Sequence, residues 1–155
     1  MKITPIEASH DAKACCGYII EDDANKLVYL TDTGVACESI FDISKNPDYL
    51  IIESNHDIKM LMATNRTMEC KKRILSPVGH LCNEDSAFAC LNIIGKNTKE
   101  IVLAHISEEA NTPEKALDAY KKIFNYRGVN IGKYKINVAN QWKSLTGGDR
   151  GSYEN

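Results

Sequence analysis

The sequence has few of the features that identify membrane, secreted or disulfide-rich proteins. No apolar run approaches the roughly 20 residues that span a bilayer, and the beginning of the chain lacks the apolar stretch of a signal peptide. Six cysteines are spread along the chain without a C-x-x-C pair, which argues against a disulfide scaffold and against a zinc ribbon. We therefore expect a cytoplasmic protein, with no membrane partner and with reduced, mostly buried thiols.

An excess of charge of one sign is also absent. The 19 Lys and Arg residues oppose 21 Asp and Glu residues, so the formal net charge is −2. A protein that wraps nucleic acid without sequence preference needs an excess of basic residues. The balance excludes that class and leaves room for a basic patch around a site. With 155 residues, 43% of them apolar, the chain has the size of one domain with its own core.

Alternating strand and helix patterns predict an α/β fold. Apolar β-rich runs indicate strands, and apolar residues at helical spacing between turn residues indicate helices. The runs at 49–52 and 100–104 are so apolar that we expect strands buried on both faces. The predicted strands lie at 2–8, 16–21, 26–31, 49–52, 100–104 and 133–139, and the predicted helices at 35–45, 57–63, 67–75, 83–95 and from 113 onward.

A few residues have expected roles at helix ends and surfaces. Asn83 belongs to the residue types that cap a helix N-terminus, and Thr112-Pro113 has the pattern of a helix start. Lys71-Lys72-Arg73 is typical of a solvated helix face, with contact to phosphates as the alternative. Residues 145–155 are polar and glycine-rich, and we expect a flexible tail there after a domain at 1–144.

The four histidines stand at the ends of predicted elements, together with two acidic residues. Loops that carry ligands in α/β folds gather outside the carboxyl ends of strands, and imidazole and carboxylate groups suit Zn²⁺ or a similar divalent ion. A histidine after a strand is more often an ordinary packed residue, so spacing alone leaves both interpretations open. The residues are His10, Asp32, Glu53, His56, His80 and His105.

Longer motifs carry more weight than this spacing. Together they resemble the metallo-β-lactamase-fold hydrolases, most of all the branch of bacterial single-domain DNA 5′ exonucleases. The pattern is more distantly similar to tRNA 3′-processing nucleases. The motifs, in family order, are S-H-D-A at 9–12, G-Y-I-I-E at 17–21, L-T-D-T-G at 30–34, L-I-I-E-S-N-H-D at 50–57, K-x-R-I-L-S at 71–76, G-H-L-C-N-E-D at 79–85 and L-A-H-I-S-E-E-A-N at 103–111.

The resemblance implies a fold and a role for each matching residue. The fold is the C-terminal half of an αββα sandwich, with one mixed sheet and flanking helices. His10, Asp32 and His105 match metal ligands, with Asp32 bridging two divalent ions, either Zn or Mn. Glu53 and His80 match a catalytic pair that handles a proton near the scissile phosphate.

Three further residues are candidates for contact with the substrate or for support of the ligands. They are His56, Asp57 and Asn83. For Asn83 the simpler role of a helix cap is the favoured one.

One family motif is not matched in this sequence. The main ligand cluster of the family has the form H-x-H-x-D-H, whereas no two histidines here stand two residues apart. A catalytic zinc usually takes three protein ligands, and the matching residues supply fewer for each metal. The resemblance therefore implies a hydrolase of phosphodiester bonds in DNA or RNA that is inactive alone. Its partner would be the N-terminal half of the same fold or a second copy, covering an exposed apolar sheet face.

Two other interpretations stay open. One is a non-catalytic binding or regulatory remnant of the same fold, for which Asp32 and His80 would be dispensable. The other is a structural zinc protein that uses Cys and His, which predicts tightly bound zinc in the isolated chain.

Overall fold

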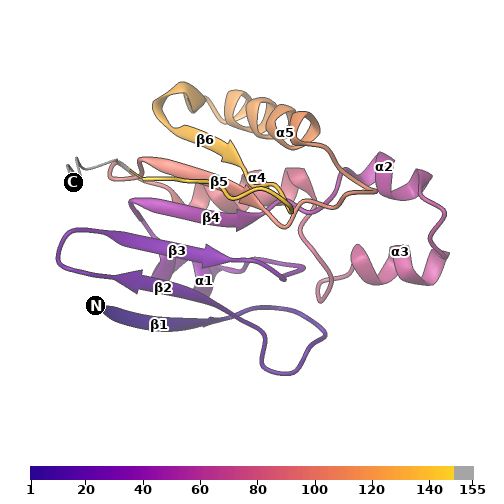
Figure 1. Ribbon diagram of the computed structural model, residues 1–155, viewed down its shortest axis with the longest axis horizontal. Helices are drawn as coiled ribbons and strands as arrows, with labels where there is room; N and C mark the ends of the chain where they lie inside the picture. Colours follow the sequence, from indigo (N-terminus) through magenta and orange to yellow (C-terminus); the bar gives the residue numbers. More distant parts are fainter. Residues whose placement is uncertain (149–155) are drawn as a thin grey trace.

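The computed structural model describes residues 1–148 and contains one mixed six-stranded sheet with helices beside it (Figure 1). The strands lie in the sheet in chain order. Neighbouring strands are antiparallel among the first three and parallel from the third to the sixth. This arrangement confirms the predicted α/β class with one mixed sheet. The strands are β1 (Lys2–Glu7), β2 (Cys16–Glu21), β3 (Lys26–Leu30), β4 (Tyr49–Glu53), β5 (Glu100–Ala104) and β6 (Lys135–Val138).

The helices divide into two groups by position. Three of them pack on one face of the sheet, and two short ones stand beyond the edge where β4 and β5 end (Figure 1). No helix of the described residues has the length and apolar character needed to cross a bilayer. The packed helices are α1 (Glu38–Ser44), α4 (Asn83–Ile93) and α5 (Pro113–Tyr126), the outlying ones are α2 (Ile58–Ala63) and α3 (Met68–Ile74), and a 3₁₀ turn, η1 (Ile131–Lys133), precedes β6.

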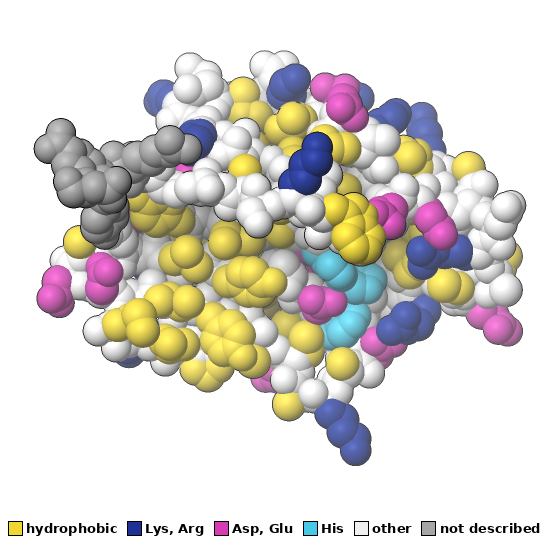
Figure 2. Space-filling model, in the orientation of Figure 1, with side chains coloured by type: hydrophobic (Ala, Val, Ile, Leu, Met, Phe, Trp, Pro, Cys, Tyr) yellow, Lys and Arg dark blue, Asp and Glu magenta, His cyan; other side chains and the backbone are white. Residues whose placement is uncertain are grey.

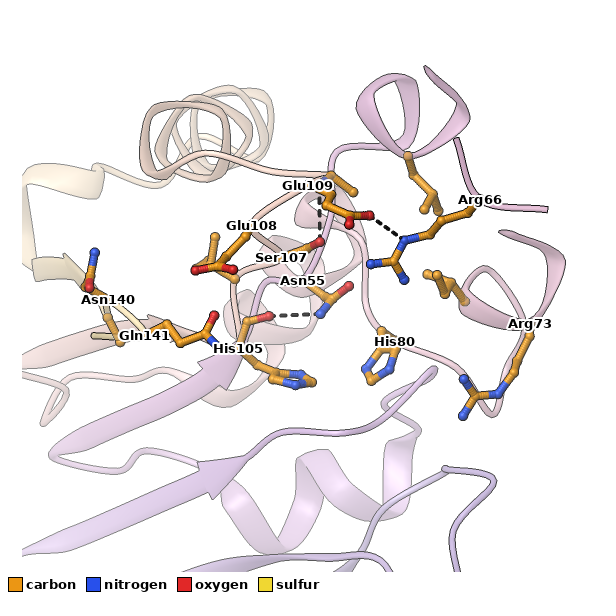
Figure 3. Close-up of a pocket in the computed structure, with 15 residues that line it drawn as sticks. Asn55, Arg66, Arg73, His80, His105, Ser107, Glu108, Glu109, Asn140 and Gln141 are labelled. Carbon is orange, nitrogen blue, oxygen red and sulfur yellow. Dashed lines mark hydrogen bonds and ion pairs between the residues drawn. The ribbon is translucent and has the colours of Figure 1, made fainter. Parts of the chain in front are cut away.

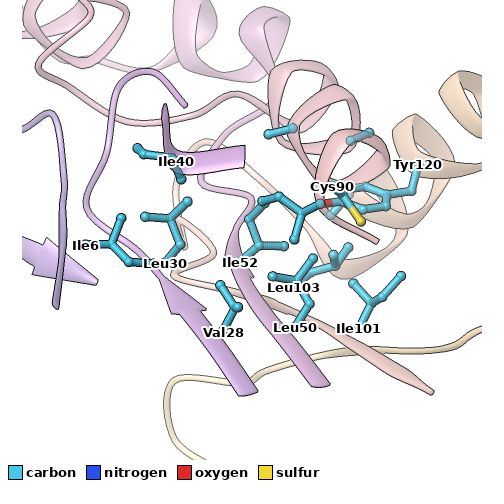
Figure 4. Packing of buried hydrophobic residues seen from close by; sticks show 14 of the residues in the cluster. Ile6, Val28, Leu30, Ile40, Leu50, Ile52, Cys90, Ile101, Leu103 and Tyr120 are labelled. Carbon is cyan, nitrogen blue, oxygen red and sulfur yellow. The ribbon is translucent and has the colours of Figure 1, made fainter. Parts of the chain in front are cut away.

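The core lies between the sheet and α1, α4 and α5. Alternate strand residues point toward these helices, and Val28, Leu50 and Ile101 lie in register across β3, β4 and β5 (Figure 4). All three are fully buried. Each buried side chain of this size contributes roughly 1.5–3 kcal/mol, so the face toward the helices supplies most of the stability.

The opposite face of the sheet, which we call the open face, is apolar and only partly covered. Tyr18, Tyr29, Ile51 and Val102 lie in register across β2 to β5 on this side. Tyr18 and Tyr29 are 39% and 38% exposed, and hydrophobic side chains gather over this part of the sheet (Figure 2). The prediction that 49–52 is buried on both faces is wrong, because Tyr49 and Ile51 lie on this side and are only half-buried.

The segment after β6 runs back over part of the open face (Figure 1). Leu145 helps to line an apolar groove with Tyr29, Tyr49 and other open-face residues. The backbone N–H of Gly148 donates to Oε2 of Glu100 at 2.6 Å. Of the tail predicted at 145–155, Leu145, Gly147 and Gly148 therefore lie beside open-face residues, and 149–155 lie outside the described residues.

A buried lysine joins the two outlying helices. Lys71 is 6% exposed, and its Nζ donates to the carbonyl oxygens of Met62 at 2.7 Å and Thr64 at 2.8 Å, where α2 ends. A positive charge is favourable at a helix C-terminus, where carbonyl groups lack partners. The prediction that 71–73 forms a solvated face is therefore wrong for Lys71, although Lys72 and Arg73 are exposed.

Replacing Lys71 with methionine tests this contact. We expect Lys71→Met to lower the free energy of unfolding by about 2 kcal/mol, because hydrogen bonds to charged groups contribute about 1.5–3 kcal/mol. Lys72→Met, on the exposed side of α3, is the matched control and should change stability by less than about 0.5 kcal/mol. Urea unfolding measures both, and equal stability of the two variants would contradict the assigned role.

Candidate metal centre

The parallel strand ends bring candidate residues from distant parts of the sequence to one edge of the sheet. Asp32 follows β3, Glu53 is the last residue of β4, and His105 follows β5. β1 runs in the same direction as β3, so His10, which follows β1, reaches the same edge. His80 joins them from the loop between α3 and α4. Five of the predicted site residues therefore converge, as expected for ligand-bearing loops at carboxyl strand ends.

The carboxylate of Glu53 is the centre of this group. Its side chain is fully buried, and Oε1 accepts hydrogen bonds from Nδ1 of His80 at 2.7 Å and Nδ1 of His105 at 2.6 Å. Oε2 accepts from the backbone N–H groups of Thr33 at 3.0 Å and Leu81 at 3.4 Å. Burial raises the pKa of Glu53, but the hydrogen bonds from His105, His80 and Thr33 outweigh it, so the net shift of the pKa is downward. The group is therefore an anion held inside the protein.

These hydrogen bonds select which nitrogen of each imidazole is available. An ionised carboxylate only accepts hydrogen bonds, so both rings carry a proton on Nδ1 and leave Nε2 for other contacts. Nε2 of His105 lies 3.7 Å from Oδ1 of Asp32. The hydrogen bond to Glu53 raises the pKa of His105, and burial opposes this shift.

The ring of His10 is also held through its Nδ1, but by a different partner. Its Nδ1 donates to the carbonyl oxygen of Gly79 at 3.0 Å, which again leaves Nε2 available. Metal-bound histidines usually donate their second ring N–H to a carboxylate or carbonyl, because that bond fixes the tautomer and the ring orientation.

The group has donor atoms that suit a divalent metal. The ligand atoms of His10, Asp32 and His80 lie within 4.8 Å of one another, and so do those of Glu53, His80 and His105. The His80 ring centroid lies 4.9 Å from that of His10 and 5.1 Å from that of His105, so His80 stands between them. Imidazole and carboxylate donors at this spacing fit Zn²⁺ or Mn²⁺. The individual ligand roles stay a prediction.

Two site residues have a backbone conformation that side chains disfavour. Asp32 and His105 have φ values of 55° and 54°, in the left-handed region. Such residues cost about 1–3 kcal/mol and persist only where the surrounding structure holds them. Here the residue after Asp32 bonds to Glu53, and Nδ2 of Asn55 donates to the His105 carbonyl oxygen at 2.9 Å. Asp and His adopt this region more often than most other residues, so residue type permits the conformation without predicting it.

Asn83 does not have its predicted role. The N-cap of α4 is Cys82, whose Sγ accepts from the Asp85 N–H at 3.4 Å. Asn83 is the first helical residue, and its side chain is buried. Its Oδ1 accepts from Ser54 Oγ at 2.7 Å and from Asn111 Nδ2 at 2.8 Å. The cap prediction is wrong because the chain enters the helix one residue earlier.

This amide network joins the loops that carry the site. Nδ2 of Asn111 also donates to the Ser54 carbonyl oxygen at 2.8 Å, so the end of β4, the start of α4 and the loop after β5 are tied together. Ser54 and Asn111 were not singled out from the sequence. The available signal was that both are polar residues next to elements that carry a candidate ligand.

The two remaining candidates lie in the loop after β4. Asp57 caps α2, since its Oδ1 accepts from the Met60 N–H at 2.8 Å. His56 is 1% exposed, and neither ring nitrogen has a hydrogen-bond partner among the described residues. Burial lowers the pKa of His56 to about 4. The proposed roles of these residues toward substrate stay predictions.

A cavity of about 560 Å³ opens beside the cluster (Figure 3). His80 and His105 line it together with two arginines, Arg66 and Arg73, from the region of α2 and α3. Sequence reasoning missed Arg66, and for Arg73 it left open a solvated helix face or contact with phosphates. The cavity is therefore lined both by imidazoles, which can transfer a proton, and by guanidinium groups, which can bind an anion.

Comparison with known proteins gives consistent matches along most of the chain. A family model described as a beta-lactamase superfamily domain matches residues 1–106. The exodeoxyribonuclease YycJ of Bacillus anthracis is 35% identical over 133 residues, which cover 86% of this chain and 50% of that protein. The exodeoxyribonuclease WalJ of Streptococcus pneumoniae strain D39 is 43% identical over 108 residues, 70% of this chain and 40% of that protein.

A solved structure shares the fold. The metallo-beta-lactamase fold protein YhfI from Bacillus subtilis superposes with a TM-score of 0.61 at 20% identity, over 88% of this chain and 46% of that chain. The chain therefore spans about half the length of the relatives that it matches.

The buried His56 generates a prediction about acid stability. Its pKa of about 4 in the folded protein lies below the ordinary value of 6.5, so folding favours the neutral ring. This contribution is complete above pH 6.5 and is lost as the pH falls toward 4. Between these limits the stability of the protein should fall by about 3 kcal/mol more than that of His56→Leu, because one pKa unit corresponds to about 1.4 kcal/mol. Urea unfolding across this range tests it, and parallel curves for the two proteins would contradict it.

Proposed function

This chain belongs to the beta-lactamase superfamily, and from that premise we propose that it provides part of a metal-dependent nuclease site. The observation that carries the proposal is that one buried oxygen of Glu53 accepts hydrogen bonds from both His80 and His105. Relatives named as exodeoxyribonucleases support DNA as the substrate class. The reaction would be hydrolysis of a phosphodiester bond.

The metal in this proposal is bound by His10, Asp32 and His105. Bound divalent ions, Zn or Mn, would lower the pKa of a water molecule and offset the negative charge of the phosphate. Ligand atoms of His10 and Asp32 lie within 4.8 Å of each other, and Nε2 of His105 lies 3.7 Å from Oδ1 of Asp32.

The pair formed by Glu53 and His80 handles the proton. His80 lines the cavity, and with Nδ1 bonded to Glu53 its Nε2 is the atom that would donate a proton to the departing oxygen. The hydrogen bond to Glu53 fixes the orientation of the His80 ring, as a carboxylate does behind a catalytic histidine. Glu53 also orients His105, so it couples proton transfer to metal binding.

We further propose that the open face packs against a second sheet that supplies the remaining metal ligands. The chain spans about half the length of its relatives, and a contiguous apolar face of this kind marks an interface. The partner is the N-terminal half of the same fold, with a second copy of this chain as the alternative. Without that partner we expect weak metal binding and little hydrolysis.

Glu53→Gln tests the catalytic part of this proposal. The variant keeps the shape of the side chain but removes its charge, and we expect DNA hydrolysis to fall by about 10²–10⁴-fold. The assay combines the chain with the N-terminal half of a full-length relative, in Mn²⁺ or Zn²⁺. Glu38→Gln, an exposed substitution on α1, is the control and should retain full activity.

The outcome also separates the alternatives. Hydrolysis that Glu53→Gln leaves unchanged would contradict the assigned roles. A combined preparation that assembles and binds metal without hydrolysing DNA would favour a non-catalytic remnant of the fold.

Tyr29→Glu tests the proposed interface. A charge in the middle of the open face should weaken association with the N-terminal half, or with a second copy, by at least about tenfold, since a buried unpaired charge costs several kcal/mol. Tyr126→Glu places the same charge on an exposed residue of α5 and should have no effect. Sedimentation velocity measures both, and an unassociated wild-type chain in the presence of that half would overturn the interface.

A further inference from the structure

The cavity beside the metal centre has two arginines on one side and the only tryptophan of the sequence beside its lining. We propose that this cavity is a nucleotide subsite for single-stranded nucleic acid, in which Arg66 and Arg73 bind phosphate and Trp142 stacks on a base. The inference rests on the proposed nuclease function and specifies how its substrate is held.

The two arginines are held in place by carboxylates. Nε of Arg66 donates to Oε2 of Glu109 at 2.9 Å, and Arg73 contacts Asp11 through both Nε and Nη2, the latter at 2.7 Å. A guanidinium has five N–H donors in a rigid plane and suits the oxygens of a phosphate. These contacts use one donor of Arg66 and two of Arg73, so the ion pairs orient the groups without using all of their donors. Both arginines lie on the same side of the cavity in Figure 3, with His80 beside them.

Trp142 is placed for contact with a flat apolar ligand. It is 77% exposed, and its Nε1 donates to Oε1 of Glu108 at 2.6 Å. Glu108 lines the cavity, as do Asn140 and Gln141, which directly precede the tryptophan. The hydrogen bond fixes the edge of the indole and leaves most of the ring exposed. Aromatic side chains in this situation bind single-stranded nucleic acid by stacking on its bases.

The acidic residues of the cavity favour this interpretation over a second cation site. Glu109 is engaged by Arg66 and Glu108 by Trp142, so both carboxylates already serve the groups that would hold the nucleotide. Glu109 and Asp11 also offset the charges of Arg66 and Arg73, which suits a subsite for one nucleotide better than a groove that follows a long strand. The volume of about 560 Å³ is typical of small-ligand sites.

Because Trp142 is the only tryptophan, its fluorescence reports the event directly. We expect a short oligothymidylate, added to the 155-residue chain with a chelator present, to bind and quench this fluorescence. An abasic oligomer of the same length should bind about 5- to 100-fold more weakly, because each stacked base contributes substantially to affinity. Trp142→Ala should weaken oligothymidylate binding by a similar factor, measured with a fluorescently labelled oligomer, and Trp142→Phe should restore most of it.

The arginines are tested by the salt dependence of binding. Each phosphate contact that is removed should reduce the slope of log affinity against log salt by about 0.7. Arg66→Ala with Arg73→Ala should therefore reduce the slope by about 1.4. The matched control removes two positive charges from α5, by Lys121→Ala with Lys122→Ala, and should leave the slope unchanged. Arg-to-Lys substitution at both positions keeps the charge and should preserve the slope while weakening affinity.

Binding is measured without metal and without turnover, so a failure of the proposed subsite can be distinguished from a failure of the proposed nuclease function. The subsite would be overturned if oligothymidylate binds without changing the tryptophan fluorescence and if the arginine variants bind it with the salt dependence of the wild-type chain. Absence of binding by the wild-type chain would also overturn it. In either case hydrolysis that depends on Glu53 would leave the proposed nuclease function intact.

Discussion

The candidate site depends on the burial of one charged group, the carboxylate of Glu53. An ionised carboxylate inside a protein is strongly unfavourable unless hydrogen bonds and opposite partial charges replace its water. Four N–H groups do so here, from Thr33, His80, Leu81 and His105. Those donors come from the loop after β3, the loop before α4 and the loop after β5. Satisfying the carboxylate therefore also determines where the candidate ligands lie.

The sheet is asymmetric, and the asymmetry connects the fold to the function. α1, α4 and α5 cover one face, so the residues that point toward them form the core. The other face carries Tyr18, Tyr29 and Ile51 without a comparable layer of helices. The site lies at an edge between these two faces. A second sheet packed on the open face would therefore approach the strand ends that hold Asp32 and His105.

Much of the fold could be predicted from the sequence, because strand and helix periods are local properties. β2 and β5 agree with their predicted bounds at both ends, and Thr112 caps α5 as expected, since its side chain accepts from Lys115 N–H. The convergence of five site residues could also be predicted, because loops at the carboxyl ends of parallel strands lie at one edge of a sheet and because the motifs resemble a known family. These residues are His10, Asp32, Glu53, His80 and His105.

What could not be predicted depends on contacts between distant residues. The burial of Lys71 follows from carbonyl groups at the end of α2, and the sequence around it is that of a solvated helix. The role of Asn83 follows from Ser54 and Asn111, which are 29 and 28 residues away. The half-buried side of β4 follows from which layers pack on the sheet. Asp and His are enriched in the left-handed region, but residue type alone does not place Asp32 and His105 there.

The most direct test of this account is nitrogen-15 NMR of the histidine rings, of which the chain has four. At a pH above the ordinary histidine range, His80 and His105 should carry the proton on Nδ1, with a low-field proton resonance for each. Glu53→Gln should shift both resonances and leave that of His10, which donates to Gly79, in place. A ring of His80 or His105 protonated only on Nε2, or resonances that do not respond to Glu53→Gln, would contradict the central role of the buried carboxylate.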